Sequence, residues 1–169
     1  SSFRNTFYFN RTHPVYGAHI NIQDIRNKTL LTNGFEARVQ QMLTYGARWN
    51  VTKKITIEGT FTDGMKESSA ALFANRNYQI DYQTMEPKFT YQPSKNFRWS
   101  LTYTYSYKKN VHVTELGERA IINDGGVLLR WNAPSKGSVE AGANFVQIQY
   151  SGQTTTTTLA YEMLNGLKD

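Results

Sequence analysis

The feature that most constrains the fold is a long alternation of apolar and polar residues with a period of two. Between residues 35 and 50, seven of the eight odd positions are apolar or aromatic, but only one of the eight even positions is. The apolar odd positions are Phe35, Ala37, Val39, Leu43, Tyr45, Ala47 and Trp49. A helix would scatter these residues around its axis, whereas an extended strand places them on one face. The pattern predicts a strand of roughly 50 Å, longer than most strands of soluble domains.

The same alternation recurs along the chain. Residues 97–108 alternate aromatic or apolar side chains with small or basic ones, and shorter examples occur at residues 55–61 and 127–131. Two other segments change phase partway along. The apolar positions are even at Tyr78–Tyr82 but odd at Phe89 and Tyr91, and residues 139–150 change in the opposite sense. We expect one β-bulge in each of these two segments, since a bulge shifts the alternation by one residue.

Connections of two lengths separate the predicted strands. Short polar turns begin at residues 11, 51, 93 and 134, and a fifth is expected at residue 165. Longer connections are expected at residues 24–33, 63–75, 109–118 and 151–156, where Gly, Asn and Asp gather. Residues 123–126 fit either a hairpin turn or the middle of a strand. The chain is thus predicted to be all-β, an antiparallel up-and-down meander of about nine strands.

The meander is predicted to be a single domain, residues 1–169, built from hairpin units of about forty residues. Its alternation fits two architectures. In a soluble sandwich or small barrel the apolar face points inward. In a transmembrane β-barrel, or part of a larger one, the apolar face meets lipid and the polar face lines the lumen. The regular alternation of short and longer connections favours the transmembrane barrel, whose two rims differ in this way.

Aromatic residues near the short turns favour the membrane as well. All three tryptophans lie within about three residues of a short turn. Although aromatic residues prefer strands in general, a band at one rim is typical of a membrane interface. The predicted membrane-interface residues are Phe9, Tyr16, Trp49, Tyr91, Trp99 and Trp131. A second girdle, near the longer connections, is predicted from Phe35, Phe61, Tyr78 and Tyr107.

Charged residues on the polar positions would project into the lumen of such a barrel. The predicted lumen-facing residues are Glu36, Arg38, Arg48, Glu58, Asp81, Arg98, Arg130 and Glu140. In a soluble protein the same residues would simply face water, so they do not separate the two architectures.

Composition excludes several classes of protein. The mean hydropathy is −0.57 and no apolar run approaches the ~18 residues of a membrane helix. The absence of cysteine excludes a disulfide framework and thiolate metal sites. The net charge of +6 is compatible with an anionic partner. Because the basic residues gather at turns and opposite the aromatics, they form no stacking platform, and we predict no nucleic-acid partner.

No motif for catalysis or cofactor binding is found. The three histidines lack metal-ligand spacing, and no glycine-rich phosphate loop occurs. Ser106, His112 and Asp124 could in principle form a catalytic triad. The sequence around Ser106, however, lacks the nucleophile-elbow motif that would support a catalytic serine. We therefore predict no catalytic, cofactor-binding or metal-binding residue, no cofactor, and a protein that is not an enzyme.

Two segments, residues 76–93 (RNYQIDYQTMEPKFTYQP) and residues 161–169 (YEMLNGLKD), resemble outer-membrane barrel regions of large surface proteins from Bacteroidota. The resemblance implies a β-barrel in the outer membrane of a Gram-negative bacterium and carries over no catalytic residue. Such barrels commonly end in a strand with a terminal aromatic, whereas this chain ends at Leu167-Lys168-Asp169 and starts without a signal peptide. We therefore expect it to be a piece of a longer protein.

These observations favour a non-enzymatic segment of an outer-membrane β-barrel with a structural, transport or complex-scaffolding role. Its expected partners are the lipid bilayer and other strands or subunits of a larger outer-membrane assembly. One alternative is a soluble secreted all-β binding module whose exposed aromatics hold carbohydrate or protein. Another is an intramembrane hydrolase, which requires a Ser–His or Asp–His pair at one rim.

Overall fold

The computed structural model describes residues 1–31, 34–70, 77–112, 118–133, 136–152 and 163–164, and these contain eight strands. The strands are β1 (Ser2–Phe9), β2 (Tyr16–Leu31), β3 (Gly34–Thr52), β4 (Ile55–Ala70), β5 (Tyr78–Ser94), β6 (Phe97–Asn110), β7 (Arg119–Ala133) and β8 (Gly137–Ser151). Seven of them have 14 to 19 residues, as the long alternation predicted.

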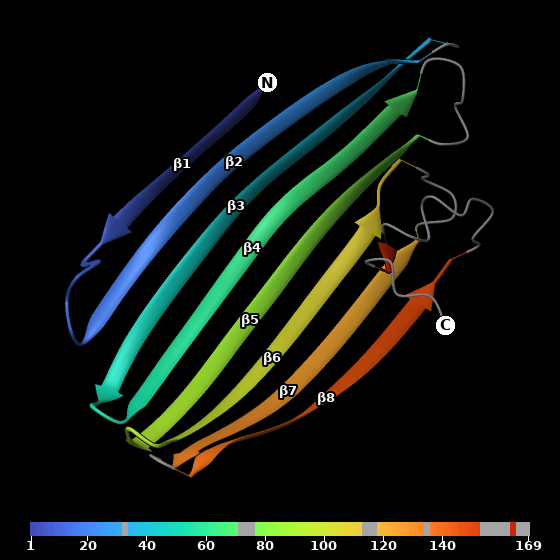
Figure 1. Cartoon of the computed structure of the whole chain (residues 1–169). Helices are drawn as coiled ribbons and strands as arrows, with labels where there is room; N and C mark the ends of the chain where they lie inside the picture. Colours follow the sequence, from blue (N-terminus) through green and yellow to red (C-terminus); the bar gives the residue numbers. More distant parts are fainter. Residues whose placement is uncertain (32–33, 71–76, 113–117, 134–135, 153–162, 165–169) are drawn as a thin grey trace.

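All eight strands belong to one antiparallel sheet in the order β1-β2-β3-β4-β5-β6-β7-β8 (Figure 1). The predicted all-β class and the up-and-down meander are confirmed. The sheet is open: β1 and β8 are its edges, and no ladder joins them within the described residues.

The short turns lie together at one end of the sheet (Figure 1). Lys53 and Lys54 join β3 to β4, and the Thr52 hydroxyl accepts bonds from the amides of Lys54 and Ile55 at 3.2 and 3.1 Å. Between β5 and β6, the Ser94 hydroxyl accepts the Asn96 amide at 3.3 Å. Local side-chain bonds of this kind favour tight turns. Three predicted short turns are thus confirmed, and the fourth lies partly outside the described residues.

Two of the longer connections were predicted too long. Residues 24–31 continue β2, and residues 63–70 continue β4. Their polar side chains are held by neighbours: Gln41 Nε2 donates to Asp24 at 3.0 Å, and Gln83 Nε2 donates to Asp63 at 3.1 Å. These cross-strand bonds, added to the backbone ladder, extend the strands through sequences whose composition suggests loops.

The expected ninth strand is not found among the described residues. It would occupy residues 157–164, of which only Met163 and Leu164 are described, and neither is in a strand. The turn expected at residue 165 also lies outside the described residues. Residues 123–126, which fitted either a turn or a strand, lie inside β7 and pair with both β6 and β8.

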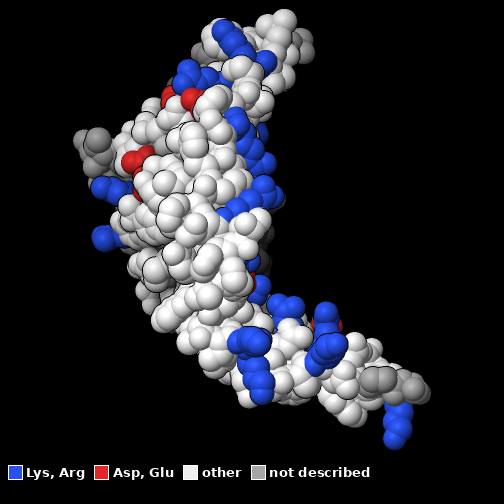
Figure 2. Space-filling model, turned by 90° about the vertical axis from the view of Figure 1, so that its left-hand side faces the viewer, with Lys and Arg blue, Asp and Glu red and all other residues white. Residues whose placement is uncertain are grey.

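The sheet is curved and presents a convex and a concave face (Figure 2). The ladders place Ile20, Tyr45 and Phe61 side by side on the convex face, and His19, Gly46 and Thr60 on the concave face. Crowding distinguishes the two. A Cβ added at Gly59, on the convex face, would meet nothing within 4 Å, whereas one at Gly46 would lie 2.0 Å from the His19 ring. Side chains therefore converge on the concave side and spread apart on the convex side.

The two predicted β-bulges are absent. The β4–β5 and β7–β8 ladders keep one register throughout, and β5 slips against β6 only at the turn, between Tyr91 and Ser94. The phase changes have a different cause. Near the short turns the apolar residues lie on the convex face, whereas near the other end Tyr78, Ile80 and Tyr82 lie on the concave face. The apolar surface changes sides while the strands stay regular.

Candidate functional site

The convex face carries a wide apolar band near the short turns. One row of cross-strand partners runs through seven strands, from β2 to β8. It contains Tyr16, Trp49, Ile57, Phe89, Leu101, Val127 and Ala143. Large side chains of this band are exposed, among them Tyr45, Phe61 and Leu101, each at 40% or more. Within the described residues no other layer covers them.

The six predicted interface aromatics form a belt along the rim of this band. All six lie on the convex face, close to the short turns: Phe9, Tyr16, Trp49, Tyr91, Trp99 and Trp131. Tyr16 is the direct partner of Trp49, and Tyr91 of Trp99. Trp99 also meets Phe89 edge-on, with ring centroids 5.6 Å apart. The aromatic belt therefore follows one rim of the sheet, with Ile55 and Ile57 of β4 between Trp49 and Tyr91.

The opposite girdle is only partly present. Phe35, Phe61 and Tyr107 lie on the convex face, whereas Tyr78 is buried on the concave face. Beyond the apolar band, toward the end opposite the short turns, the convex face becomes polar. Asp24 lies in this polar region and is paired with Arg26 at 2.8 Å. The Nζ atom of Lys28 lies 4.0 Å from the centre of the Phe35 ring.

The concave face is polar over most of its area, and Lys and Arg lie along it in profile (Figure 2). A row of hydroxyl and amide side chains crosses its middle. Thr44 bonds Thr62 at 3.1 Å, Thr84 bonds Ser106 at 3.1 Å, and Thr6 donates to Asn21 at 2.9 Å. Cross-strand polar pairs satisfy one another without burying charge. This surface suits contact with water or a polar solute.

Seven of the eight charged residues predicted for the polar face lie on the concave face: Glu36, Arg38, Arg48, Glu58, Arg98, Arg130 and Glu140. Ion pairs on this face join Arg38 to Glu36 at 2.8 Å, Lys88 to Glu58 at 3.2 Å and Arg130 to Glu140 at 2.6 Å.

The placement of Asp81 was predicted wrongly. It lies on the convex face, opposite Met65 and Lys109. The prediction assumed that Ile80 and Tyr82 share a face with Phe89, which an unbroken strand does not allow.

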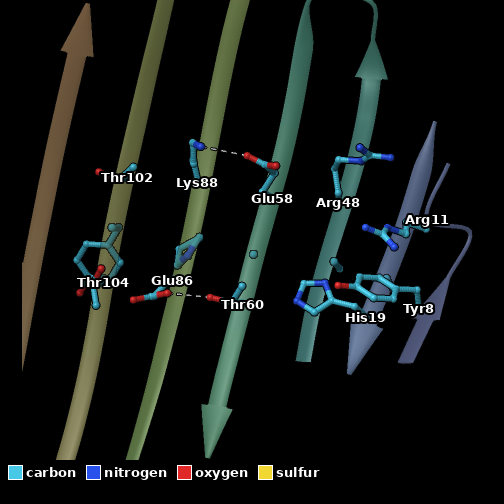
Figure 3. A pocket seen from close by; sticks show the side chains of 16 residues that line it. Tyr8, Arg11, His19, Arg48, Glu58, Thr60, Glu86, Lys88, Thr102 and Thr104 are labelled. Atoms are coloured by element: carbon cyan, nitrogen blue, oxygen red, sulfur yellow. Dashed lines mark hydrogen bonds and ion pairs between the residues drawn. The ribbon is translucent and has the colours of Figure 1, made fainter. Parts of the chain in front are cut away.

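A groove of about 550 Å³ opens on the concave face across β1 to β6 (Figure 3). Two of its charged residues, Arg48 and Glu58, were predicted. Arg48 donates to the backbone oxygen of His13 at 3.0 Å, which ties the first turn to β3. The remaining labelled lining residues were missed: Tyr8, Arg11, His19, Thr60, Glu86, Lys88, Thr102 and Thr104. The alternation Tyr16, Ala18, Ile20, Ile22 assigns His19 to the polar face and could have found it.

The groove combines aromatic and charged side chains, some of which contact or hydrogen-bond one another. The Arg11 guanidinium carbon lies 4.5 Å from the centre of the Tyr8 ring, and Tyr8 and His19 have ring centroids 6.0 Å apart. Thr60 donates to a Glu86 carboxylate oxygen at 2.9 Å. Figure 3 shows these side chains projecting from adjacent strands over a shared surface.

An apolar cluster occupies the far end of the concave face. Tyr78, Ile80 and Ala120 are buried there, and Met163 is fully buried against them. Tyr150 and Leu164 pack around this cluster. Part of the chain beyond β8 therefore covers the concave side at the end opposite the short turns.

Glu118 lies beside this cluster and only 6% of it is exposed. Burial raises the pKa of its carboxyl above the ordinary value of 4.5, and the nearby Tyr150 and Asn110 side chains partly oppose the shift. Since the folded state holds the proton more tightly, its contribution to stability is full below pH 4.5 and is lost as the pH rises through the raised pKa.

We predict that Glu118→Gln increases the free energy of unfolding at pH 7, because the amide removes the cost of a buried charge. The difference from wild type should vanish near pH 4, where the carboxyl is neutral in both states. Urea unfolding followed by tryptophan fluorescence at the two pH values measures this. A variant less stable than wild type at pH 7 contradicts the prediction.

Within the described part of the chain, Ser106, His112 and Asp124 are not hydrogen-bonded to one another as a catalytic triad would be. Ser106 shares its hydroxyl bond with Thr84, and His112 lies beyond the end of β6, where its backbone amide donates to Asn110. No group of three or more metal-ligating side chains is found among the described residues. No described helix combines the length and apolar character needed to cross a membrane.

Comparison of this chain with protein-family models, with curated proteins and with solved structures finds no match in any of the three.

Proposed function

We propose that this chain forms part of the wall of a transmembrane β-barrel in a bacterial outer membrane, with its convex face toward lipid and its concave face toward an aqueous lumen. The observation that carries the proposal is the exposed apolar band of the convex face, bordered by the aromatic belt. Outer-membrane barrels carry an apolar band of this kind on the outside and a polar interior.

The soluble alternative needs a second layer over the apolar band. Monomeric soluble proteins rarely expose contiguous apolar patches beyond roughly 300–600 Å². The described residues outside the sheet and its turns include Met163, which packs on the concave face and leaves the convex face open. Lipid is the simplest partner for a large convex apolar surface.

The size of the band suits a bilayer. On β4 the convex positions are apolar or glycine from Ile55 to Phe61, and on β8 from Val139 to Phe145. Each stretch spans roughly 20 Å at 3.3 Å per residue. On β6 the convex positions from Phe97 to Tyr107 span roughly 33 Å. These lengths bracket the ~25 Å band of outer-membrane barrels.

The stagger of the strands also supports a barrel. Trp49 and Phe89 lie in the same row of partners, on either side of Ile57, but at different distances from their turns. Trp49 is four residues before Lys53, the first residue of the β3–β4 turn, whereas Phe89 is six residues before Lys95, the first residue of the β5–β6 turn. The hairpins are therefore stepped relative to one another, so the strands tilt relative to the rim. Closing a barrel requires such tilt and shear.

The proposed role is structural or transport-related and not enzymatic. Within the described residues, no strand pairs with the outer edge of β1 or of β8, and a lipid environment does not tolerate unpaired backbone groups. Further strands, from the same protein or from a partner subunit, are therefore proposed to pair with both edges and complete the wall.

The tryptophans test this proposal directly, because all three lie on the convex face near the short-turn rim. In liposomes containing brominated lipids, we expect strong quenching of their fluorescence. Bromine near the headgroups should quench more than bromine near the chain ends, since aromatic belts lie at the interface.

Acrylamide in the water phase serves as the control and should quench weakly. A protein that is monodisperse in plain buffer, with tryptophans insensitive to brominated lipid, would contradict the membrane proposal and support a soluble binding module instead.

A further inference from the structure

A second groove lies on the concave face across β5 to β8, nearer the short turns. Its volume is about 700 Å³, and its polar lining consists of three basic side chains, two hydroxyls and one amide. These are Lys88, Arg98, Arg130, Ser100, Thr102 and Asn144. No carboxylate is among the lining residues, but Lys88 and Arg130 are ion-paired with Glu58 and Glu140 beside the groove. We call it the cationic groove.

The two arginines of the cationic groove are direct cross-strand partners on β6 and β7. Side chains in such positions have Cβ atoms about 5 Å apart, and like charges placed this way repel each other. Arg130 is neutralised by Glu140, through bonds from Nε at 2.8 Å and Nη2 at 2.6 Å. In the described part of the chain Arg98 makes no ion pair, so one guanidinium of the pair keeps its charge uncompensated.

Glycines keep the floor of the cationic groove open. A Cβ added at Gly126 would lie 2.8 Å from both Asn144 Oδ1 and Thr102 Oγ1. Without that Cβ, the amide and the hydroxyl converge over the backbone of β7. Ser100, only 7% exposed, adds a further hydroxyl beside Arg98. Hydroxyl and amide side chains from β6 and β8 therefore surround the space between the basic side chains.

We propose that the cationic groove binds the oxyanion group, phosphate or carboxylate, of a solute. Arg98 provides a planar fork of donors that matches two oxygens of such a group. Arg130 and Lys88 add positive charge, while Ser100 and the amide nitrogen of Asn144 donate to the remaining oxygens. The Thr102 hydroxyl lines the groove but already donates to the Gly126 backbone oxygen at 3.3 Å. Glu140 and Glu58 hold Arg130 and Lys88 when no anion is bound.

The proposal rests on the geometry of the concave face and does not depend on the membrane. In a barrel wall, the same groove would place an anion-attracting site in the lumen near the short-turn rim. Lipid quenching tests the proposed barrel wall, and anion titration tests the cationic groove. The failure of one proposal can therefore be told apart from the failure of the other.

Inorganic phosphate and acetate are the probes, titrated separately into the folded protein in zwitterionic detergent at low ionic strength. Isothermal calorimetry, with ³¹P line broadening for phosphate, gives the affinity. Arg98→Gln should weaken binding about tenfold or more, because a hydrogen bond to a charged group contributes about 1.5–3 kcal/mol. Arg98 is exposed, so the substitution should leave the sheet intact.

Two further variants sharpen the test. Arg38→Gln is the matched control. Arg38 lies on the concave face of β3, toward the end of the sheet opposite the short turns, and is paired with Glu36 at 2.8 Å. It should leave the affinity unchanged. Glu140→Gln should tighten binding several-fold, because it releases Arg130 for the anion.

Binding of either probe with this pattern supports the proposal, and the better probe identifies phosphate or carboxylate as the preferred group. Absence of saturable binding for both probes overturns it. Equal losses in Arg98→Gln and Arg38→Gln also overturn it, because they would indicate general charge attraction and no site.

Discussion

Replacing Leu101 with arginine is expected to destabilise the protein in a bilayer by about 2–4 kcal/mol, the cost of a basic residue at the midplane of a barrel's lipid face. Leu101 lies on the convex face, opposite Phe89 on one side and Val127 on the other. It is four residues into β6, roughly 13 Å from the short-turn rim along the strand. That position is near the middle of the apolar band. Urea unfolding in phospholipid vesicles, followed by tryptophan fluorescence, measures the loss.

Gln147→Arg is the matched control for this substitution. Gln147 is exposed on the same face, beyond the apolar band, where β8 has become polar. Its cost should be at most about 1 kcal/mol, since the penalty falls toward the interface. If both substitutions cost the same small amount, the convex face does not meet hydrocarbon, and the wall proposed above fails.

The strands and the aromatic belt were predictable because they depend on local information. Alternation along a single strand assigns each residue to one of two faces, whatever the neighbouring strands do. Trp49, Trp99 and Trp131 lie on different strands, yet each could be placed from its distance to a short turn. Regular meander order then aligned the turns at one end, so the belt followed from the sequence alone.

The change of apolar face in β5 could not be predicted in the same way. A bulge, and a real exchange of the apolar side, give the same sequence pattern: even apolar positions at Tyr78–Tyr82, then odd ones at Phe89 and Tyr91. Only the pairing with β4 distinguishes them, since one constant register excludes an extra residue. Asp81 was misplaced for this reason.

The grooves lay beyond sequence reasoning for a related reason. Lys88 and Glu58 are thirty residues apart and meet only because the β4–β5 register makes them partners. Arg98 faces Arg130 through the β6–β7 register. A strand's pattern gives the face of each residue but not its neighbour across the sheet, which depends on where every hairpin turns.

Because the apolar residues of β5 change from the concave to the convex face along the strand, a second large effect is expected at Ile80. This residue is 1% exposed on the concave face and packs in the cluster with Tyr78, Ala120 and Met163. Ile80→Ala should cost about 2–5 kcal/mol, because the lost side chain leaves a cavity among protein neighbours. Equilibrium unfolding of the variant in the same vesicles gives the value.

Ile57→Ala gives the comparison, with the same chemical change on the convex face. Ile57 is 41% exposed, so lipid chains can fill the space that its side chain leaves. Its cost should be smaller, at most about 1 kcal/mol. Similar costs at the two positions would mean that Ile80 also faces outward, as a bulge in β5 would require. A large cost at Ile80 and a small one at Ile57 supports a wall whose far end is packed from inside by its own chain.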